Sequence, residues 1–177
     1  MQVLSVNSEL FQKVRQLRSR YIGDNPAGEG KFTDAEACRD SCSYHMAYLD
    51  GDEVVGAIRI TPLGHGMSFT EQVVDLRCHF KYPMDSFDAN RLVLDEKYRG
   101  GLHLKFFLLQ TAIWLKANTQ FRHVSALCRG RLAALYVDMG GHVLAEDVIW
   151  AGCQTRRRYS LVYLEVETVL NTIKKGK

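Results

Sequence analysis

The chain has 177 residues, of which 46% are apolar and 24% are charged, as is typical of one globular domain. Lysine and arginine number 23 against 20 for aspartate and glutamate, and this net charge of +3 is too small to indicate a nucleic-acid-binding face. No run of about 18 apolar residues indicates a membrane-spanning helix, and the first residues lack a secretory-signal pattern. We therefore expect one domain over residues 1–177, located in the cytoplasm and without integral membrane association.

The five cysteines are irregularly spaced, and no second tight pair completes the loose spacing of Cys38 and Cys42 into a zinc site. We therefore expect free thiols, as is usual in a reducing compartment, and no metal ion.

The first half of the chain predicts two helical segments and a hairpin. Apolar residues recur at helical spacing over residues 8–22, with Ser8 as the N-cap, and Thr33 precedes a second, short helical turn. Two strand-like runs at 44–49 and 53–61 are joined by an Asp-Gly turn, which indicates a β-hairpin. Residues 62–87 predict a short element and a loop.

The second half predicts strands at 90–94, 124–128, 142–150 and 159–166, helices at 102–117 and 132–139, and a lysine-rich tail. This order of elements favours an α/β (α+β) fold with a mixed, mostly antiparallel, twisted sheet flanked by helices.

The segment Arg91–Leu104 carries the clearest chemical pattern. A strand runs into an Arg-Gly-Gly turn that opens directly into a helix. The unpaired N–H groups and the dipole at such a helix start suit a phosphate group. The same turn without a ligand is an equally good interpretation of the pattern alone.

The segment resembles the acyl-donor motif of the Gcn5-related N-acetyltransferase (GNAT) superfamily, a strand followed by a glycine-rich turn and a helix. The run Ala133–Leu144 is similar to the second signature of that superfamily, in which a helix carrying a tyrosine, here Tyr136, ends at a glycine, here Gly140. The two matches and the strand order cover about residues 44–150 and imply a GNAT-like fold.

The resemblance implies that a phosphopantetheine thioester, on coenzyme A or on an acyl carrier protein, is the acyl donor. Leu102 and Leu104 stand where the superfamily usually has glycines, which restricts access of a diphosphate to the backbone and favours a carrier-protein donor. The residues that the resemblance assigns to the donor are Leu92, Val93, Leu94, Arg99, Gly100, Gly101, Leu102, His103 and Leu104.

A narrower resemblance links the chain to acyl-homoserine-lactone synthases and N-acyl amino acid synthases. Residues 88–91 look like their Glu-x-Ser-Arg motif, with aspartate for glutamate and asparagine for serine, and residues 58–62 resemble their Arg-x-x-Pro strand end. Their arginine-bearing first helix is echoed by Arg15 and Arg18, and their acidic loop by Asp34, Glu36 and Asp40. These families transfer long-chain acyl groups to the amine of an amino acid or a derivative.

The residue types fit this chemistry. Asp88, directly or through water, is the predicted base that accepts a proton from the acceptor ammonium, and Arg91 and Arg59 are predicted to bind the acceptor carboxylate. The resemblance makes Tyr136 the donor of a proton to the departing thiolate. The backbone near Val93 and Leu94 is predicted to stabilise the oxyanion.

The helix at 102–117 is apolar nearly all round, which is typical of a core helix and also of the wall of an acyl tunnel. We predict that Phe106 and Phe107 contribute to this wall, with Trp150 and residues 148–149 opposite. The predicted cationic rim for an acidic carrier protein consists of Lys97, Arg99, Lys105 and Arg156–Arg158.

Three functions follow as alternatives. The first is an N-acyltransferase that moves a fatty-acyl group from a pantetheine thioester to a small amine such as an amino acid. The second is an acetyl-CoA-dependent N-acetyltransferase of a small amine or a protein. The third is a regulator with the same fold that binds a ligand without catalysis.

Overall fold

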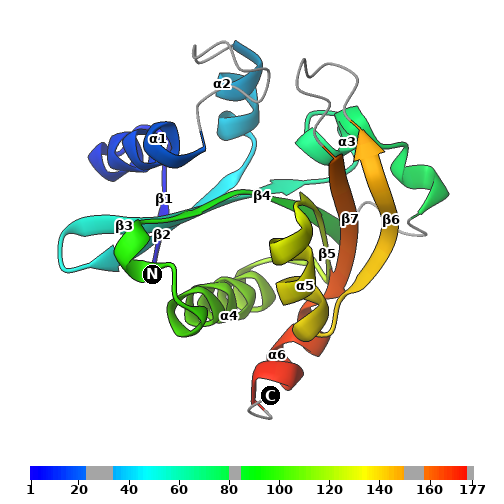
Figure 1. The fold of residues 1–177 in the computed structure, drawn as a ribbon. Helices are drawn as coiled ribbons and strands as arrows, with labels where there is room; N and C mark the ends of the chain where they lie inside the picture. The colour runs from blue at the N-terminus through cyan, green and yellow to red at the C-terminus, as the bar shows by residue number, and fades with distance from the viewer. Residues whose placement is uncertain (23–33, 80–84, 150–157, 175–177) are drawn as a thin grey trace.

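The computed structural model describes residues 1–22, 34–79, 85–149 and 158–174, which form one seven-stranded sheet with the order β1-β2-β3-β4-β5-β7-β6 (Figure 1). All neighbouring strands are antiparallel except β4 and β5, which are parallel. The strands are β1 (Gln2–Leu4), β2 (Tyr44–Asp50), β3 (Glu53–Pro62), β4 (Ser86–Leu94), β5 (His123–Cys128), β6 (His142–Ile149) and β7 (Arg158–Glu165). The predicted mixed, mostly antiparallel fold is confirmed.

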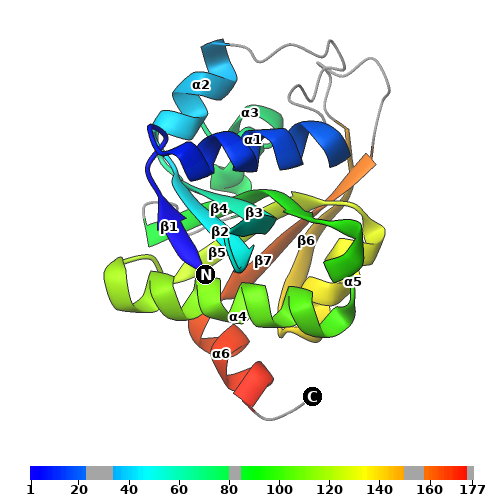
Figure 2. The same cartoon turned by 90° about the vertical axis from the view of Figure 1, so that its left-hand side faces the viewer.

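The helices cover the sheet on both faces (Figures 1 and 2). The helices of one face are α1 (Glu9–Tyr21), α2 (Asp34–Ser41) and α3 (Phe69–Val73), followed by the 3₁₀ turn η1 (Leu76–Cys78). Those of the other are α4 (Gly101–Asn118), α5 (Gly130–Asp138) and α6 (Val166–Lys174). A second 3₁₀ turn, η3 (Glu96–Tyr98), connects β4 to α4. We call these two faces the α1 face and the α4 face.

Local sequence signals account for most of these elements. The Ser8 side chain accepts a hydrogen bond from the Phe11 N–H at 3.2 Å and so starts α1, as predicted. The hairpin of β2 and β3 is confirmed, with Gly51 at φ +56° in its turn. The helix predicted after Thr33 is α2, although Thr33 itself lies outside the described residues.

Three elements differ from the sequence prediction. The strand predicted at 90–94 begins four residues earlier, because polar Ser86, Asp88 and Asn90 alternate with Phe87 and Ala89 and are all paired with neighbouring strands or side chains. The N-terminal strand β1 and the helix α6 were not predicted. Both are short, and they are stabilised mainly by packing on β2 and on α4.

The core has one part on each face of the sheet, as strand alternation requires. Met46, Ile58 and Phe87 point to the α4 face, whereas Ala47 and Ala57 point to the α1 face and pack with Phe11, Val14 and Leu17. Along β4 and β5, successive side chains therefore alternate between the α4 face and the α1 face.

The parallel strands β4 and β5 pair only at their beginnings. Three residue pairs join them, Ser86 with His123, Phe87 with Val124 and Asp88 with Ser125, although the strands continue to Leu94 and Cys128. Beyond Asp88 the two strands separate, and we call the space between them the slot.

The end of α5 is fixed by two glycines. The Gly141 N–H donates to the Tyr136 carbonyl at 2.9 Å and the Gly140 N–H donates to the Val137 carbonyl at 2.9 Å, which together form a Schellman motif. Gly140 has φ +92°, and a Cβ there would lie 2.6 Å from the Thr168 side chain of α6. The end of α5 therefore packs against α6 so closely at Gly140 that only glycine fits there.

We expect Gly140→Val to lower the free energy of unfolding by about 2–4 kcal/mol, since it adds left-handed backbone strain to a steric clash. Gly130→Ala is the matched control, because a Cβ at Gly130 meets no atom within 4 Å and a change of less than about 0.5 kcal/mol is expected. Urea denaturation of both variants measures the difference. Equal losses would show that the α5–α6 junction does not need glycine.

Candidate functional site

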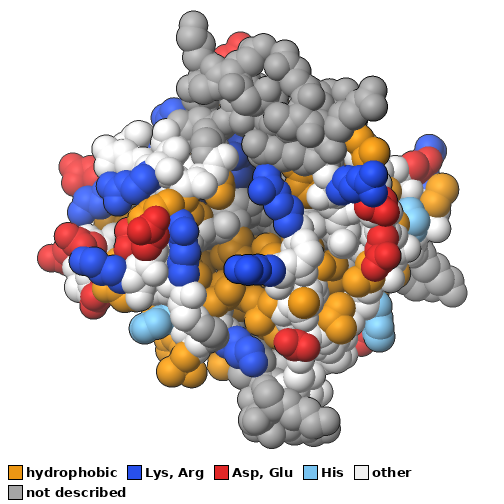
Figure 3. All heavy atoms as spheres, in the orientation of Figure 1, with side chains coloured by type: hydrophobic (Ala, Val, Ile, Leu, Met, Phe, Trp, Pro, Cys, Tyr) orange, Lys and Arg blue, Asp and Glu red, His pale blue; other side chains and the backbone are white. Residues whose placement is uncertain are grey.

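The slot is flanked by two strands that are each followed by a helix. In open α/β sheets ligands bind beyond the carboxyl ends of parallel strands where the chain connections diverge, and β4–α4 and β5–α5 meet this description. From residue 89 onward, β4 has no recorded pairing with β5, so backbone groups on this edge are available to a ligand. Figure 3 shows hydrophobic side chains at the centre of this region, with Lys and Arg side chains around them.

The start of α4 has the features of an anion site. Its N-cap, Gly100, has no side-chain cap, and the first intrahelical bond recorded there runs from the Leu104 N–H to the Gly100 carbonyl. The N–H groups of Gly101, Leu102 and His103 therefore point out of the helix end, where the dipole favours negative charge. This is where the sequence predicted the donor phosphate.

Arg99 and His103 are already engaged in this turn. The Arg99 Nε donates to the Leu94 carbonyl at 3.0 Å, and its guanidinium stacks 4.3 Å from the centre of the Tyr21 ring. The His103 Nδ1 lies 3.2 Å from the Tyr48 hydroxyl. Both side chains therefore stabilise the turn, and the stacked Arg99 keeps a positive charge beside it.

A β-bulge shapes the β4 edge of the slot. The register between β3 and β4 shifts between Ala57 and Arg59, and Arg91 takes a left-handed backbone conformation with φ +53°. Consequently Asn90 and Arg91, two consecutive residues, both contact residues of the α1 face. Without the bulge, Arg91 would point to the opposite face.

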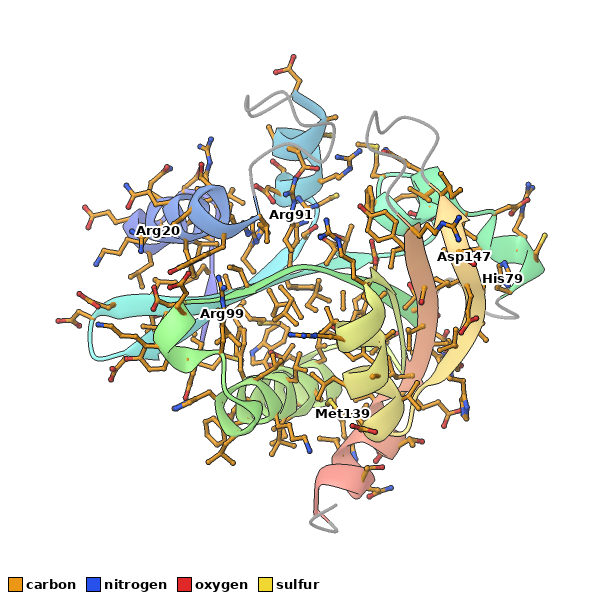
Figure 4. All side chains as sticks on the ribbon, viewed as in Figure 1. Arg20, His79, Arg91, Arg99, Met139 and Asp147 are labelled. Carbon is orange, nitrogen blue, oxygen red and sulfur yellow. The ribbon has the colours of Figure 1, made fainter. Side chains whose placement is uncertain are left out.

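Arg91 belongs to a buried cluster of ionic side chains between β3, β4 and α2 (Figure 4). Glu36 Oε2 lies 3.0 Å from Arg59 Nη1 and 3.0 Å from Arg91 Nη2, and it bridges the two guanidiniums. Asp40 Oδ1 accepts from Arg59 at 2.9 Å and from Arg18 at 3.3 Å. From the sequence, Glu36 and Asp40 were assigned only to an acidic loop. In the structure they pair with Arg59 and Arg91, the arginines that were predicted to bind the acceptor.

Two arginines of the cluster differ in accessibility. Arg59 is 1% exposed and its Nε donates to Asn90 Oδ1 at 2.6 Å, so it holds the cluster together and presents no surface to a substrate. The Arg91 side chain is 11% exposed. The burial of Arg59 corrects the prediction that it contacts the acceptor and indicates a positioning role, whereas the acceptor contact of Arg91 stays a prediction.

The cluster controls the ionisation of its members. Burial alone would raise the pKa of Glu36, but the guanidiniums of Arg59, Arg91 and Arg39 outweigh it and lower this pKa to about 2. Burial and the nearby Arg18 lower the pKa of His45 to about 4, so this ring is neutral at pH 7. Glu36 thus remains a carboxylate and is a poor base.

Asp88 lies on the α1 face at the last residue pair before the slot opens. It has no exposed surface, and its carboxylate accepts hydrogen bonds from the Thr70 hydroxyl at 2.6 Å and from Asn90 Nδ2 at 3.2 Å. Burial raises its pKa, and the bonds from Thr70 oppose this. A raised pKa suits a base, whereas the enclosure leaves no direct path to an acceptor, and the role of Asp88 stays a prediction.

On the α4 face an apolar cavity lies under the slot. Its volume is about 40 Å³. Its walls come from β3, β4, β5, β7 and the three helices of this face, and they are Ile58, Ile60, Phe87, Ala89, Leu108, Thr111, Ala112, Leu115, Val124, Tyr136, Met139, Leu164, Val166 and Val169. Phe87 and Val124 form the last cavity-facing pair before the strands separate, so the cavity and the slot adjoin.

Tyr136 is 3% exposed and lines this cavity from α5. Burial raises its pKa, so its hydroxyl stays protonated at neutral pH and can only give a proton to a stronger base. A thiolate is a weaker base than a tyrosinate, so the Tyr136 hydroxyl is suited to donate a hydrogen bond to a sulfur atom in the slot rather than to lose its proton to it. Tyr136 and Asp88 thus lie on opposite faces of the sheet.

The predicted acyl wall is partly wrong. Phe106 points outward and is 47% exposed, and Phe107 stacks on Tyr48 at 5.5 Å; neither lines the cavity. Val148 packs in a cluster with Leu63 and Leu161, away from the cavity, and Trp150 lies outside the described residues. The α4 residues that do line the cavity are Leu108, Thr111, Ala112 and Leu115. Their spacing of three and four residues, typical of one helix face, is the sequence pattern that could have identified them.

Among residues 1–22, 34–79, 85–149 and 158–174, no three His, Cys, Asp or Glu side chains lie close enough to hold a metal ion. Within the same ranges, no helix combines the length and the apolar character needed to cross a membrane.

Comparison with solved structures identifies the architecture. A CoA-dependent acyl-homoserine lactone synthase, BjaI, superposes with a TM-score of 0.66 at 15% identity, over 98% of this chain and 87% of that one. The acyl-homoserine-lactone synthase LasI gives 0.65 at 12% identity, over 93% and 88%. An acyl-CoA N-acyltransferase from Pseudomonas aeruginosa gives 0.59 at 13% identity, over 90% and 91%.

The chain has the GNAT fold. No family model matches the sequence, and no curated protein matches it either. The GNAT resemblance predicted from residues 91–104 and 133–144 is therefore confirmed by three-dimensional likeness to acyltransferases of very different sequence.

The lowered pKa of Glu36 makes stability depend on pH. A carboxylate whose folded pKa is depressed contributes stability above its unfolded value and loses it as the pH falls through the folded value. The change from 4.5 to about 2 corresponds to roughly 3 kcal/mol, lost between about pH 5 and pH 2. We expect Glu36→Gln to lack this part of the pH dependence of the unfolding free energy, as measured by denaturation from pH 7 to pH 2. Parallel curves for both proteins would contradict the ion cluster.

Proposed function

We propose that the protein is an N-acyltransferase that moves a fatty-acyl group from a pantetheine thioester to the amine of an amino acid or a similar small carboxylate. The observation that carries this proposal is the apolar cavity that adjoins the slot on the α4 face. Its walls are almost entirely apolar, which suits a hydrocarbon chain, and at about 40 Å³ they must move apart to admit a long one.

In this proposal the donor lies along the unpaired edge of β4. Its phosphate binds the N–H groups at the start of α4, its pantetheine amides pair with the backbone of Leu92, Val93 and Leu94, and its acyl chain descends into the cavity. Each buried methylene contributes about 0.8 kcal/mol, so the cavity gives both affinity and chain-length selection.

The acceptor approaches from the α1 face. Arg91 offers a charge-assisted hydrogen bond to its carboxylate, and Glu36 and Asn90 keep the arginines of this face in place. Because the cavity lies on the other face, the amine and the thioester carbonyl meet in the slot.

The reaction is an aminolysis. The neutral amine attacks the thioester carbonyl, and the oxyanion accepts hydrogen bonds from N–H groups of the β4 edge. The C–S bond then breaks, and the nitrogen gives its proton through water to Asp88, the proposed base. The Tyr136 hydroxyl, held protonated by burial, donates a hydrogen bond to the departing sulfur from the cavity side, and the thiolate takes its proton from solvent. The products are an N-acyl amino acid and free pantetheine thiol.

Two donors carry the same pantetheine arm. The solved acyl-homoserine lactone synthases BjaI and MesI are described as CoA-dependent, which supports acyl-CoA. An acyl carrier protein is the second candidate, since Leu102 and Leu104 replace the usual glycines of the turn. A localisation in the cytoplasm, where both donors occur, is part of the proposal.

The direct test incubates the purified protein with acyl-CoA of several chain lengths, or the matching acyl carrier proteins, and a mixture of amino acids. We expect mass spectrometry to detect N-acyl amino acids that form with the wild type and fall at least a hundredfold with Arg91→Ala. Retention of product by Arg91→Ala would remove Arg91 from the acceptor site. No product with any donor or amine would refute catalysis.

The cavity makes a separate prediction about chain length. Ala112 lines it and is 8% exposed, so Ala112→Phe fills part of the space. We expect kcat/KM for a decanoyl donor to fall about tenfold or more while that for a butanoyl donor changes little. Ala117→Phe, on the exposed side of the same helix, is the matched control. An equal fall for both donors would show that the chain lies elsewhere.

A further inference from the structure

The outer side of α4 carries large apolar side chains that the described chain leaves wholly or partly exposed. Leu102 is 81% exposed, Phe106 47% and Ile113 46%, and Leu109 is half-buried between them. We call these four residues the α4 stripe. Three of the eight exposed large hydrophobic residues recorded for the described chain are thus gathered on this one helix.

The stripe is a continuous line on the helix surface. At about 100° per residue the four side chains fall within an arc of roughly 60°, and they extend over roughly 16 Å along the axis. Phe107, Thr111 and Leu115 lie on the opposite side of the helix and are buried against the sheet. Core packing accounts for that side of α4 and for part of Leu109, and it leaves most of Leu102 and about half of Phe106 and Ile113 exposed.

The charges along α4 have one sign. The helix contains Lys105 and Lys116 and no aspartate or glutamate. On the helical wheel both lysines lie about 60° or less to one side of the stripe, from where their chains can extend past apolar side chains to reach a negative surface. Lys116 also pairs with Glu167 of α6, so Lys105 is the stronger contributor.

Amphipathic rings border the other side of the stripe near its start. The Tyr48 ring lies 6.3 Å from Phe106 and its hydroxyl bonds His103, while Tyr98 packs edge-on against His103 at 5.3 Å. Aromatic rings with a polar tip are enriched where apolar and wet environments meet, as at the surface of a lipid bilayer.

The size of the stripe argues against a second copy of the chain as its partner. A stable dimer buries about 800 Å² on each subunit, far more than four side chains on one helix provide. A lipid bilayer does not need a contact area of this size, because its lipids rearrange around the apolar side chains that enter it.

We propose that the α4 stripe docks the protein on an anionic lipid bilayer, with Leu102, Phe106 and Ile113 in the interface and Lys105 at the headgroups. The helix lies in the plane of the surface, as in other interfacial helices with an apolar face and flanking lysines. This inference concerns binding alone and does not rest on the proposed function. Figure 1 shows α4 on the rim of the molecule, where such a contact leaves the α1 face open.

The test is sedimentation of the purified protein with vesicles of phosphatidylcholine alone or of equal parts phosphatidylcholine and phosphatidylglycerol. We expect binding to the anionic vesicles that weakens with salt, and a loss of about tenfold or more in the triple variant Leu102→Ser/Phe106→Ser/Ile113→Ser. The control is Val137→Ser/Val143→Ser/Ile149→Ser, which removes three apolar side chains elsewhere that are 38–48% exposed. Lys105→Glu should also weaken binding.

Absence of wild-type binding, or equal losses in the two triple variants, would overturn the proposal. Two further arms use the same proteins. Binding of the wild type to an acidic acyl carrier protein but not to vesicles, lost in the stripe variant, would assign the stripe to that partner instead. A dimer lost in the stripe variant would assign it to a second copy. Circular dichroism checks folding, and the single change Leu102→Ser replaces the triple variant if that variant does not fold.

Discussion

The separation of β4 from β5 after Asp88 and Ser125 is the constraint on which the rest of the molecule depends. Three pairs hold the two halves of the sheet together, and everything beyond them is open on a strand edge. The two helix starts, the cavity and the ion cluster are arranged around this opening, each on an element that leaves one of the two strands or covers one of its faces. A sheet fully paired at this point would be more regular and would have no place for a ligand.

The ion cluster shows how buried charges are accommodated without a large loss of stability. Isolated charges in the interior are costly, but Glu36 contacts three guanidiniums and Asp40 contacts two, so the cost is offset by several short contacts at once. The bulge at Arg91 then determines which member reaches the surface. A local irregularity of one residue thereby converts a structural network into a candidate binding site.

Sequence reasoning was most successful where chemistry is local. The Ser8 cap, the Asp50-Gly51 hairpin and the Gly-Gly turn before α4 follow from backbone preferences of single residues, whereas the GNAT resemblance rested on the motifs at 91–104 and 133–144 and on the strand order. It was less successful for Phe106 and Phe107, because α4 is apolar on every side and periodicity then cannot tell which side faces the sheet. The partners of Arg59 could not be predicted either, since both are distant in sequence: Glu36 reaches it from α2, and Asn90 through the register of β3 on β4.

Asp88 and Asn90 face one side of the sheet, while Phe87 and Ala89 face the other, so a single strand contributes to the ion cluster and to the cavity, which have no residue in common. Substitutions in α1 and α2 can therefore alter the ion cluster without touching the cavity, whose helices are α4, α5 and α6. If the proposed reaction is correct, natural variation or laboratory evolution can change the choice of amine and the choice of carbon chain independently, and combine the results in one protein.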